Sequence, residues 1–97
     1  MKTDDELKQL LAKMLPETVR WHPGLRNKLY WREAYTGVLD TELLHLCSLV
    51  EGLLNNKQAS SYVDLLINGR KATEWRAVFS TWQQRTEALA QVLKVTL

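Results

Sequence analysis

The clearest hydrophobic pattern lies in the last quarter of the chain. Apolar or small positions recur there at steps of three and four, at Trp75, Val78, Phe79, Trp82, Thr86, Leu89 and Leu93. Polar side chains fill the opposite arc, so the spacing predicts one long amphipathic helix with an aromatic-rich buried face. We expect residues 95–97 to extend this helix.

A second pattern predicts a helix at the start of the chain. Thr3 and Glu6 have the spacing of a capping box, in which each side chain binds the backbone amide of the other residue. Leucines at 7, 10 and 11 and Met14 then share one helical face. Because Pro16 disfavours helical geometry at the residue before it, we expect this helix to end near residue 14.

The next segment has a less regular pattern. Residues 16–24 predict an irregular connection, with a short helical turn from Pro16 to Arg20 as an alternative. Residues 25–36 predict a helix that Gly37 ends, but its apolar residues point two ways, with Leu25 and Leu29 on one side and Trp31, Ala34 and Tyr35 on the other. Such a helix is either packed between two neighbours or presents one face to a partner.

The middle of the chain is the most apolar region. Asp40 is a natural N-cap for a helix over 41–54, whose wide apolar stripe indicates a central position in the fold. Ser60 or Ser61 then caps a short helix that ends near residue 67. A helix-turn-helix reader is rejected here, because the connection over 55–61 is long and the short helix holds no basic residue.

Together these patterns predict an all-α fold, a single compact domain over residues 1–97 with about five helices of unequal length in an irregular bundle. Only 4 glycines and 2 prolines occur in 97 residues, too few for a sandwich of many tight turns. No repeat or low-complexity linker divides the chain.

Charge and cysteine content limit the function classes and the cellular compartments that fit the chain. The formal net charge of +2 is far from the strong basic excess of a dedicated nucleic-acid binder. The single cysteine, Cys47, cannot form an internal disulfide, and the first residues lack the order of a secretory signal, so we expect a cytoplasmic protein. The longest uncharged apolar run, residues 43–50, is too short to span a bilayer, and we expect no membrane association.

The chemistry-bearing residues give little support for catalysis. His45 and Cys47 are two positions apart, which places them on different sides of a helix, with Cys47 in the core and His45 exposed. The histidines, the cysteine and the scattered acids have no metal-ligand spacing, so we expect no metal and no cofactor. An enzyme would require His22, His45 and Cys47 to meet in one pocket, and a non-enzymatic protein is the favoured hypothesis.

One segment differs in character from the rest. Half of the chain's aromatic residues fall between residues 20 and 35, interleaved with basic residues. The set is Arg20, Trp21, Arg26, Lys28, Tyr30, Trp31, Arg32 and Tyr35. Aromatic residues and arginines are enriched in protein-binding hot spots, and the same combination binds single-stranded nucleic acid. The alternative without a ligand is that the tryptophans anchor the core and the basic side chains lie in solvent.

The favoured function is therefore a small helical protein that acts through protein–protein interaction, as an adaptor, inhibitor or accessory factor, with its small size suggesting a bacterial or phage origin. Its partner is another protein or a second copy of the chain. Self-association is an option because the basic block precedes residues 33–56, which hold four acids and no lysine or arginine, and such opposite charges attract between copies. The alternative is a weak single-stranded nucleic-acid binder that uses Arg20, Arg26, Lys28, Arg32, Trp21 and Trp31.

Overall fold

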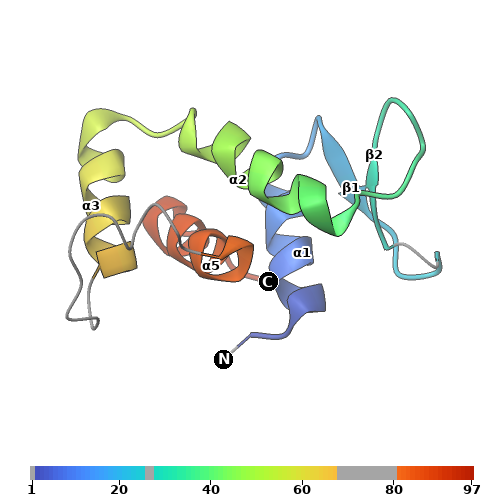
Figure 1. Cartoon of the computed structure of the whole chain (residues 1–97), viewed down its shortest axis with the longest axis horizontal. Coiled ribbons are helices and arrows are strands. Elements are labelled where there is room, and N and C mark those ends of the chain that lie inside the picture. Colours follow the sequence, from blue (N-terminus) through green and yellow to red (C-terminus); the bar gives the residue numbers. More distant parts are fainter. Residues whose placement is uncertain (1, 26–27, 68–80) are drawn as a thin grey trace.

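The computed structural model describes residues 2–25, 28–67 and 81–97. These residues form four α-helices and a two-stranded antiparallel sheet (Figure 1). The expectation of an all-α bundle of about five helices is therefore wrong. The error lies between Pro16 and Thr36, where residues 19–21 and 29–31 pair as an antiparallel hairpin in place of the expected connection and helix.

Helix α1 (Asp4–Met14) confirms the expectation for the start of the chain. The Glu6 amide donates to Thr3 Oγ1 at 3.2 Å, and the Thr3 amide donates to Glu6 Oε1 at 3.0 Å. These hydrogen bonds hold the pKa of Glu6 below its ordinary value. The helix ends at Met14, just before Leu15 and Pro16, because a residue that precedes proline avoids helical geometry.

The hairpin is built from β1 (Val19–Trp21) and β2 (Leu29–Trp31), with Arg20 opposite Tyr30. Side chains alternate between the two faces of a strand, so the apolar residues of these strands follow a period of two rather than 3.6. A short bridge joins Tyr30 to Gly37 on the other edge of β2. Gly37 therefore lies in an extended segment and does not end a helix.

The next helices begin and end at other residues than expected. Asp40 opens a 3-10 turn, η1 (Asp40–Glu42), and α2 (Leu43–Glu51) follows it. Asn55 caps α3 (Asn56–Ile67), because its side-chain oxygen accepts from the Gln58 amide at 2.8 Å. The connection between these helices is only residues 52–55, so the loop-length argument against a helix-turn-helix was wrong, although α3 carries a single basic residue, Lys57.

The last helix, α5 (Trp82–Leu93), is shorter than expected. Thr81 is its N-cap with extended backbone geometry, so no helix runs through Thr81; Trp75, Val78 and Phe79 lie outside the described residues. Lys94 has left-handed geometry and ends the helix, which overturns the expected extension to residue 97. Of the expected buried face, Thr86 and Leu89 are fully buried as predicted, whereas Trp82 and Leu93 are only half-buried against the core.

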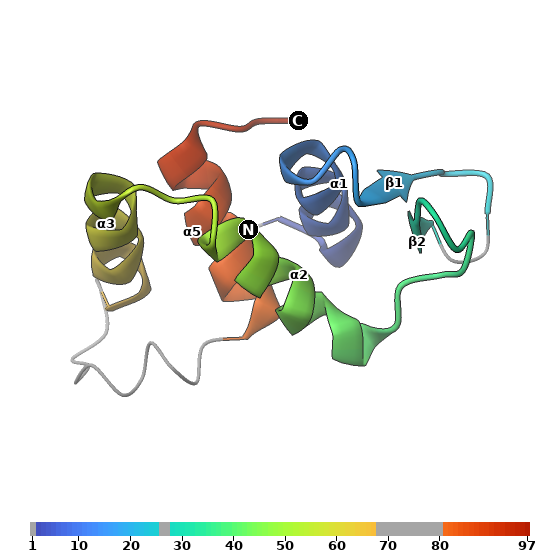
Figure 2. The same cartoon turned by 90° about the horizontal axis from the view of Figure 1, so that it is seen from above.

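Helix α5 lies at the centre of the described part of the fold and packs against α1, α2 and α3. The hairpin lies at one end of the molecule, packed on α1, and α3 lies at the other end (Figures 1 and 2). The core joins leucines of α1, α2 and α5 with the inward side of the hairpin: Leu7, Leu10, Leu11, Val19, Leu29, Leu43, Leu46, Val50 and Leu89. Among the described helices, none has the length and apolar character that crossing a bilayer requires.

Candidate functional site

The two faces of the hairpin have different surroundings. Val19, Trp21, Leu29 and Trp31 lie on the inward face; Val19 and Leu29 are buried, and both tryptophans are half-buried against the core. Trp31 Nε1 also donates a hydrogen bond of 3.3 Å to Glu42 Oε1, which ties the hairpin to η1. The two tryptophans of the predicted site thus act as core anchors on this side.

The outward face carries a cluster of aromatic rings. Tyr30 stacks on Tyr35 with ring centroids 6.4 Å apart and planes inclined by 22°. His22 lies against the same Tyr30 ring, also with centroids 6.4 Å apart but tilted by 52°. Tyr30 is therefore buried although it points away from the core, whereas Tyr35 is left 80% exposed.

Tyr35 has an unusual backbone conformation. Its φ of 54° lies in the left-handed region, which costs a residue with a Cβ about 1–2 kcal/mol. Tyr35 is the last residue of a four-residue loop, over 32–35, that is closed by a 2.8 Å hydrogen bond from the Trp31 amide to the Thr36 carbonyl. Burial of the ring does not offset this cost, because most of the ring faces solvent.

A cavity of about 470 Å³ opens beside these rings. We call this cavity the hairpin pocket. It is lined by His22, Leu25, Tyr30, Tyr35 and Gly37. Arg20 lies opposite Tyr30 on the same face of the hairpin and is exposed. Among the described residues, the Arg20 side chain has no hydrogen bond or ion pair, so its charge is available to a ligand.

The structure brings together only part of the predicted site. Lys28 forms an ion pair of 2.9 Å with Asp5, and Arg32 donates to the Pro16 carbonyl at 3.1 Å. Arg26 lies outside the described residues. Arg20, Tyr30 and Tyr35 of the predicted set lie together on the outward face, and Leu25 and Gly37, which were not in that set, complete the lining of the pocket. The alternation of apolar and polar side chains from Val19 to His22 was a partial signal for β1, whereas residues 29–31 show no such alternation.

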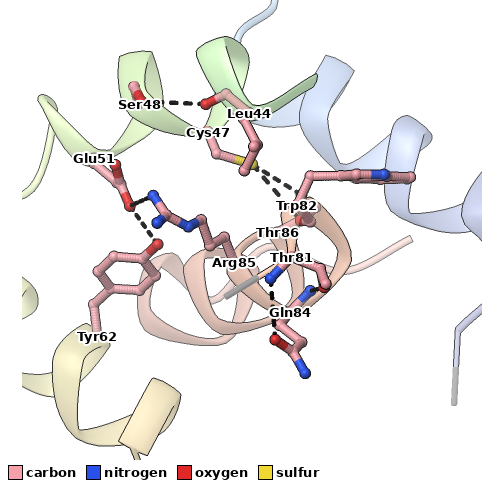
Figure 3. A network of polar contacts seen from close by, with 10 residues as sticks. All are labelled: Leu44, Cys47, Ser48, Glu51, Tyr62, Thr81, Trp82, Gln84, Arg85 and Thr86. Carbon is pink, nitrogen blue, oxygen red and sulfur yellow. Dashed lines mark hydrogen bonds and ion pairs between the residues drawn. The ribbon is translucent and has the colours of Figure 1, made fainter. Parts of the chain in front are cut away.

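The residues considered for catalysis are separated. Cys47 is fully buried between α2 and α5, with its Sγ 3.4 Å from Thr86 Oγ1 and 3.7 Å from the Trp82 carbonyl oxygen (Figure 3). Burial raises the pKa of this thiol, which disfavours the reactive thiolate. His45 is exposed on the outer side of α2, and His22 lies in the hairpin pocket. In the described ranges, no three His, Cys, Asp or Glu side chains are grouped as metal ligands would be.

A second polar cluster joins three helices (Figure 3). Glu51 of α2 accepts hydrogen bonds from the Tyr62 hydroxyl of α3 and, at 3.3 Å, from Arg85 of α5. Burial, and then the hydrogen bond to Glu51, raise the pKa of Tyr62. Every group in this cluster is engaged within the fold, so we assign it a structural role.

Comparison of the chain with protein-family models, with curated proteins and with solved structures finds no match. The functional argument therefore rests on the chemistry of the hairpin pocket and of the surfaces around it.

Proposed function

We propose that this chain is a non-enzymatic cytoplasmic protein that acts by binding another protein through the outward face of its hairpin. The observation that carries this proposal is Tyr35, which is 80% exposed while its backbone has a left-handed φ of 54°. A residue that is unfavourable for the fold, and whose side chain contributes little buried area, is a candidate for a role in binding.

The chemistry of the face supports a protein partner. Tyrosine and arginine are enriched among residues that dominate binding energy, because each combines a large contact surface with polar groups. The hairpin pocket offers the rings of Tyr30 and Tyr35 and the side chain of Leu25 as apolar walls. Arg20 adds a positive charge at the same face. These features favour an apolar side chain of the partner with an acidic residue beside it.

The same geometry gives less support to nucleic acid. Stacking on unpaired bases needs accessible rings, and Trp21 and Trp31 pack against the core. Lys28 already pairs with Asp5 at 2.9 Å. A protein partner is therefore the better-supported proposal for this face.

A peptide selection tests the proposal. We expect the immobilised chain to select, from a displayed library of random peptides, sequences with an acidic residue next to a leucine or an aromatic residue. Arg20→Glu should weaken the binding of these peptides at least about tenfold, because it reverses the charge that the acidic residue contacts. Fluorescence anisotropy with labelled peptides measures the change.

Lys57→Glu is the matched control, because it makes the same kind of charge reversal on α3, at the other end of the molecule. Equal affinities in Arg20→Glu and Lys57→Glu would contradict the proposal. If the chain instead binds oligonucleotides in a way that needs Arg20 and weakens steeply with salt, the partner of this face is single-stranded nucleic acid and not a protein.

A further inference from the structure

An extended segment, residues 36–38, lies along the outer edge of the hairpin. The bridge between Tyr30 and Gly37 pairs this segment with β2 in antiparallel orientation. Arg20 pairs with Tyr30 on the other side of β2, so Arg20, Tyr30 and Gly37 form one row across the hairpin. Residues of such a row place their side chains on the same face of a sheet. The Cβ that Gly37 lacks would therefore point to the outward face, where the hairpin pocket lies.

The neighbouring hydrogen bonds fix the direction of the polar backbone groups of Gly37. The Thr36 carbonyl accepts from the Trp31 amide at 2.8 Å, so it points toward β2. The Val38 amide donates to the Leu29 carbonyl at 2.9 Å, so it also points toward β2. Because successive residues of a strand direct these groups to opposite sides, the N–H and C=O of Gly37 point away from β2. Neither group has a hydrogen-bond partner among the described residues.

This open edge is one residue long. Two residues further along the chain, both backbone groups of Leu39 are already used. Its amide donates to Glu42 Oε1 at 2.9 Å, and its carbonyl accepts from the Glu42 amide at 2.8 Å. In the other direction, the Tyr35 amide donates to the Trp31 carbonyl at 2.9 Å. A chain that pairs with this edge is therefore held in a single register, which Gly37 sets.

The surroundings of Gly37 suit a second backbone. Glycine has no side chain, and within a strand it often marks a position that another backbone approaches closely. Gly37 lines the hairpin pocket together with Leu25, Tyr30 and Tyr35, and this cavity has a volume of about 470 Å³. A backbone bound at Gly37 would therefore place a side chain beside one aliphatic and two aromatic walls.

We propose that the protein partner binds the hairpin face as an extended segment that pairs with Gly37. One residue of the partner, which we call the anchor residue, donates its N–H to the Gly37 carbonyl and accepts the Gly37 N–H at its own carbonyl. The anchor side chain is apolar and enters the hairpin pocket, because a residue directly opposite Gly37 lies on the outward face. In strand addition of this kind, main-chain hydrogen bonds give affinity and pockets give specificity. This inference rests on the proposed function, because it gives the conformation of the partner at the same face.

N-methylation of the selected peptides tests the pairing. Methylation of the anchor amide removes the N–H that donates to Gly37, so the affinity should fall at least about tenfold. The amides immediately before and after the anchor residue point away from Gly37, and methylation there should change the affinity by less than about threefold. An ester in place of the anchor amide removes the same donor without adding a methyl group, and it should also weaken binding. Fluorescence anisotropy measures each affinity.

Exchange of backbone amides with water, measured by NMR, detects the same contact in the protein. The Gly37 amide has no acceptor among the described residues of the free chain, whereas the Val38 amide is bonded to Leu29. Binding of a selected peptide should slow exchange at Gly37 at least about tenfold relative to Val38, because the bound carbonyl protects the Gly37 amide.

A change on another apolar surface is the control in the protein. Leu44 and Leu49 of α2 are 46% and 39% exposed, so the wide stripe that predicted a central helix is covered on one side only. Leu49 lies toward the end of α2 that is remote from the hairpin (Figure 2). Leu49→Glu should therefore bind the selected peptides as tightly as the wild type. Equal weakening in this variant would show that the peptides do not bind at the hairpin.

Three further results would overturn the inference. Peptides that need Arg20 but tolerate N-methylation at every position would bind through side chains alone, which leaves the proposed function in place. A chain that selects no peptide would remove both the inference and the proposed function. Protection of the Gly37 amide that rises with protein concentration, without any peptide, would show that the edges of two copies pair with each other.

Discussion

Replacing Leu89 by Ala is expected to lower the free energy of unfolding by about 2–5 kcal/mol, a range typical of buried leucine truncations. Leu89 is fully buried on α5, and α5 packs against all three of the other described helices, so the resulting cavity lies where these helices meet. Because total stability is typically about 5–15 kcal/mol, the loss is a large fraction of it. Urea unfolding followed by circular dichroism measures the change.

Leu97→Ala is the matched control, since it makes the same truncation at a side chain that is half exposed at the end of the chain. We expect the control to change the free energy of unfolding by no more than about 0.5 kcal/mol. A Leu89→Ala variant as stable as this control would contradict the assignment of α5 to the centre of the core.

Replacing Glu51 by Ala is expected to cost about 1–3 kcal/mol, because the Tyr62 hydroxyl and Arg85 both lose their carboxylate acceptor. The Glu51 and Arg85 side chains are 27% and 17% exposed, so water can replace part of the lost hydrogen bonding. The loss of unfolding free energy is therefore smaller than for a fully buried ion pair. Thermal and urea unfolding measure it. Glu17→Ala, at an exposed acid, should have almost no effect, and equal stability of the two variants would contradict the role of the cluster.

The cluster also predicts a loss of stability at high pH. The pKa of Tyr62 is raised in the folded protein above the ordinary value of 10.0, so the folded state keeps this proton where the unfolded state releases it. The contribution is fully present below pH 10.0 and is lost as the pH rises toward the raised pKa of Tyr62. Tyr62→Phe should remove this part of the alkaline decline.

The parts of the fold that depend on local signals could be predicted from the sequence. The capping pair Thr3 and Glu6 and the proline at 16 set both ends of α1, because these effects act within one or two turns. The burial of Cys47 and the exposure of His45 followed from helix geometry alone.

The hairpin could not be found in this way because its evidence is not local. Residues 25–36 lack a single helical stripe because Leu29 and Trp31 face inward while Tyr30 faces outward, and pairing with residues 19–21 decides between strand and helix. The wide stripe of α2 was misjudged for a related reason. The sequence shows how many sides of a helix are apolar, but only the packing of the folded chain shows which of those sides a neighbouring element covers.

The structure divides the residues predicted for the candidate site between the two faces of the hairpin. Composition singled out residues 20–35, yet it could not tell that Trp31 faces the core while Tyr35 faces solvent. The left-handed backbone of Tyr35 carries no sequence signature, since tyrosine seldom occupies that region. The docking role of these residues stays a prediction.

The most direct test of the central claim, that the outward face of the hairpin is a docking surface, is the affinity of Tyr35→Gly for the selected peptides, measured with its unfolding free energy. Glycine relieves the left-handed backbone while losing a ring that is mostly exposed, so stability should stay within about 1 kcal/mol of the wild type. Peptide affinity should fall at least about tenfold. A folded Tyr35→Gly chain that binds these peptides as tightly as the wild type would contradict the account.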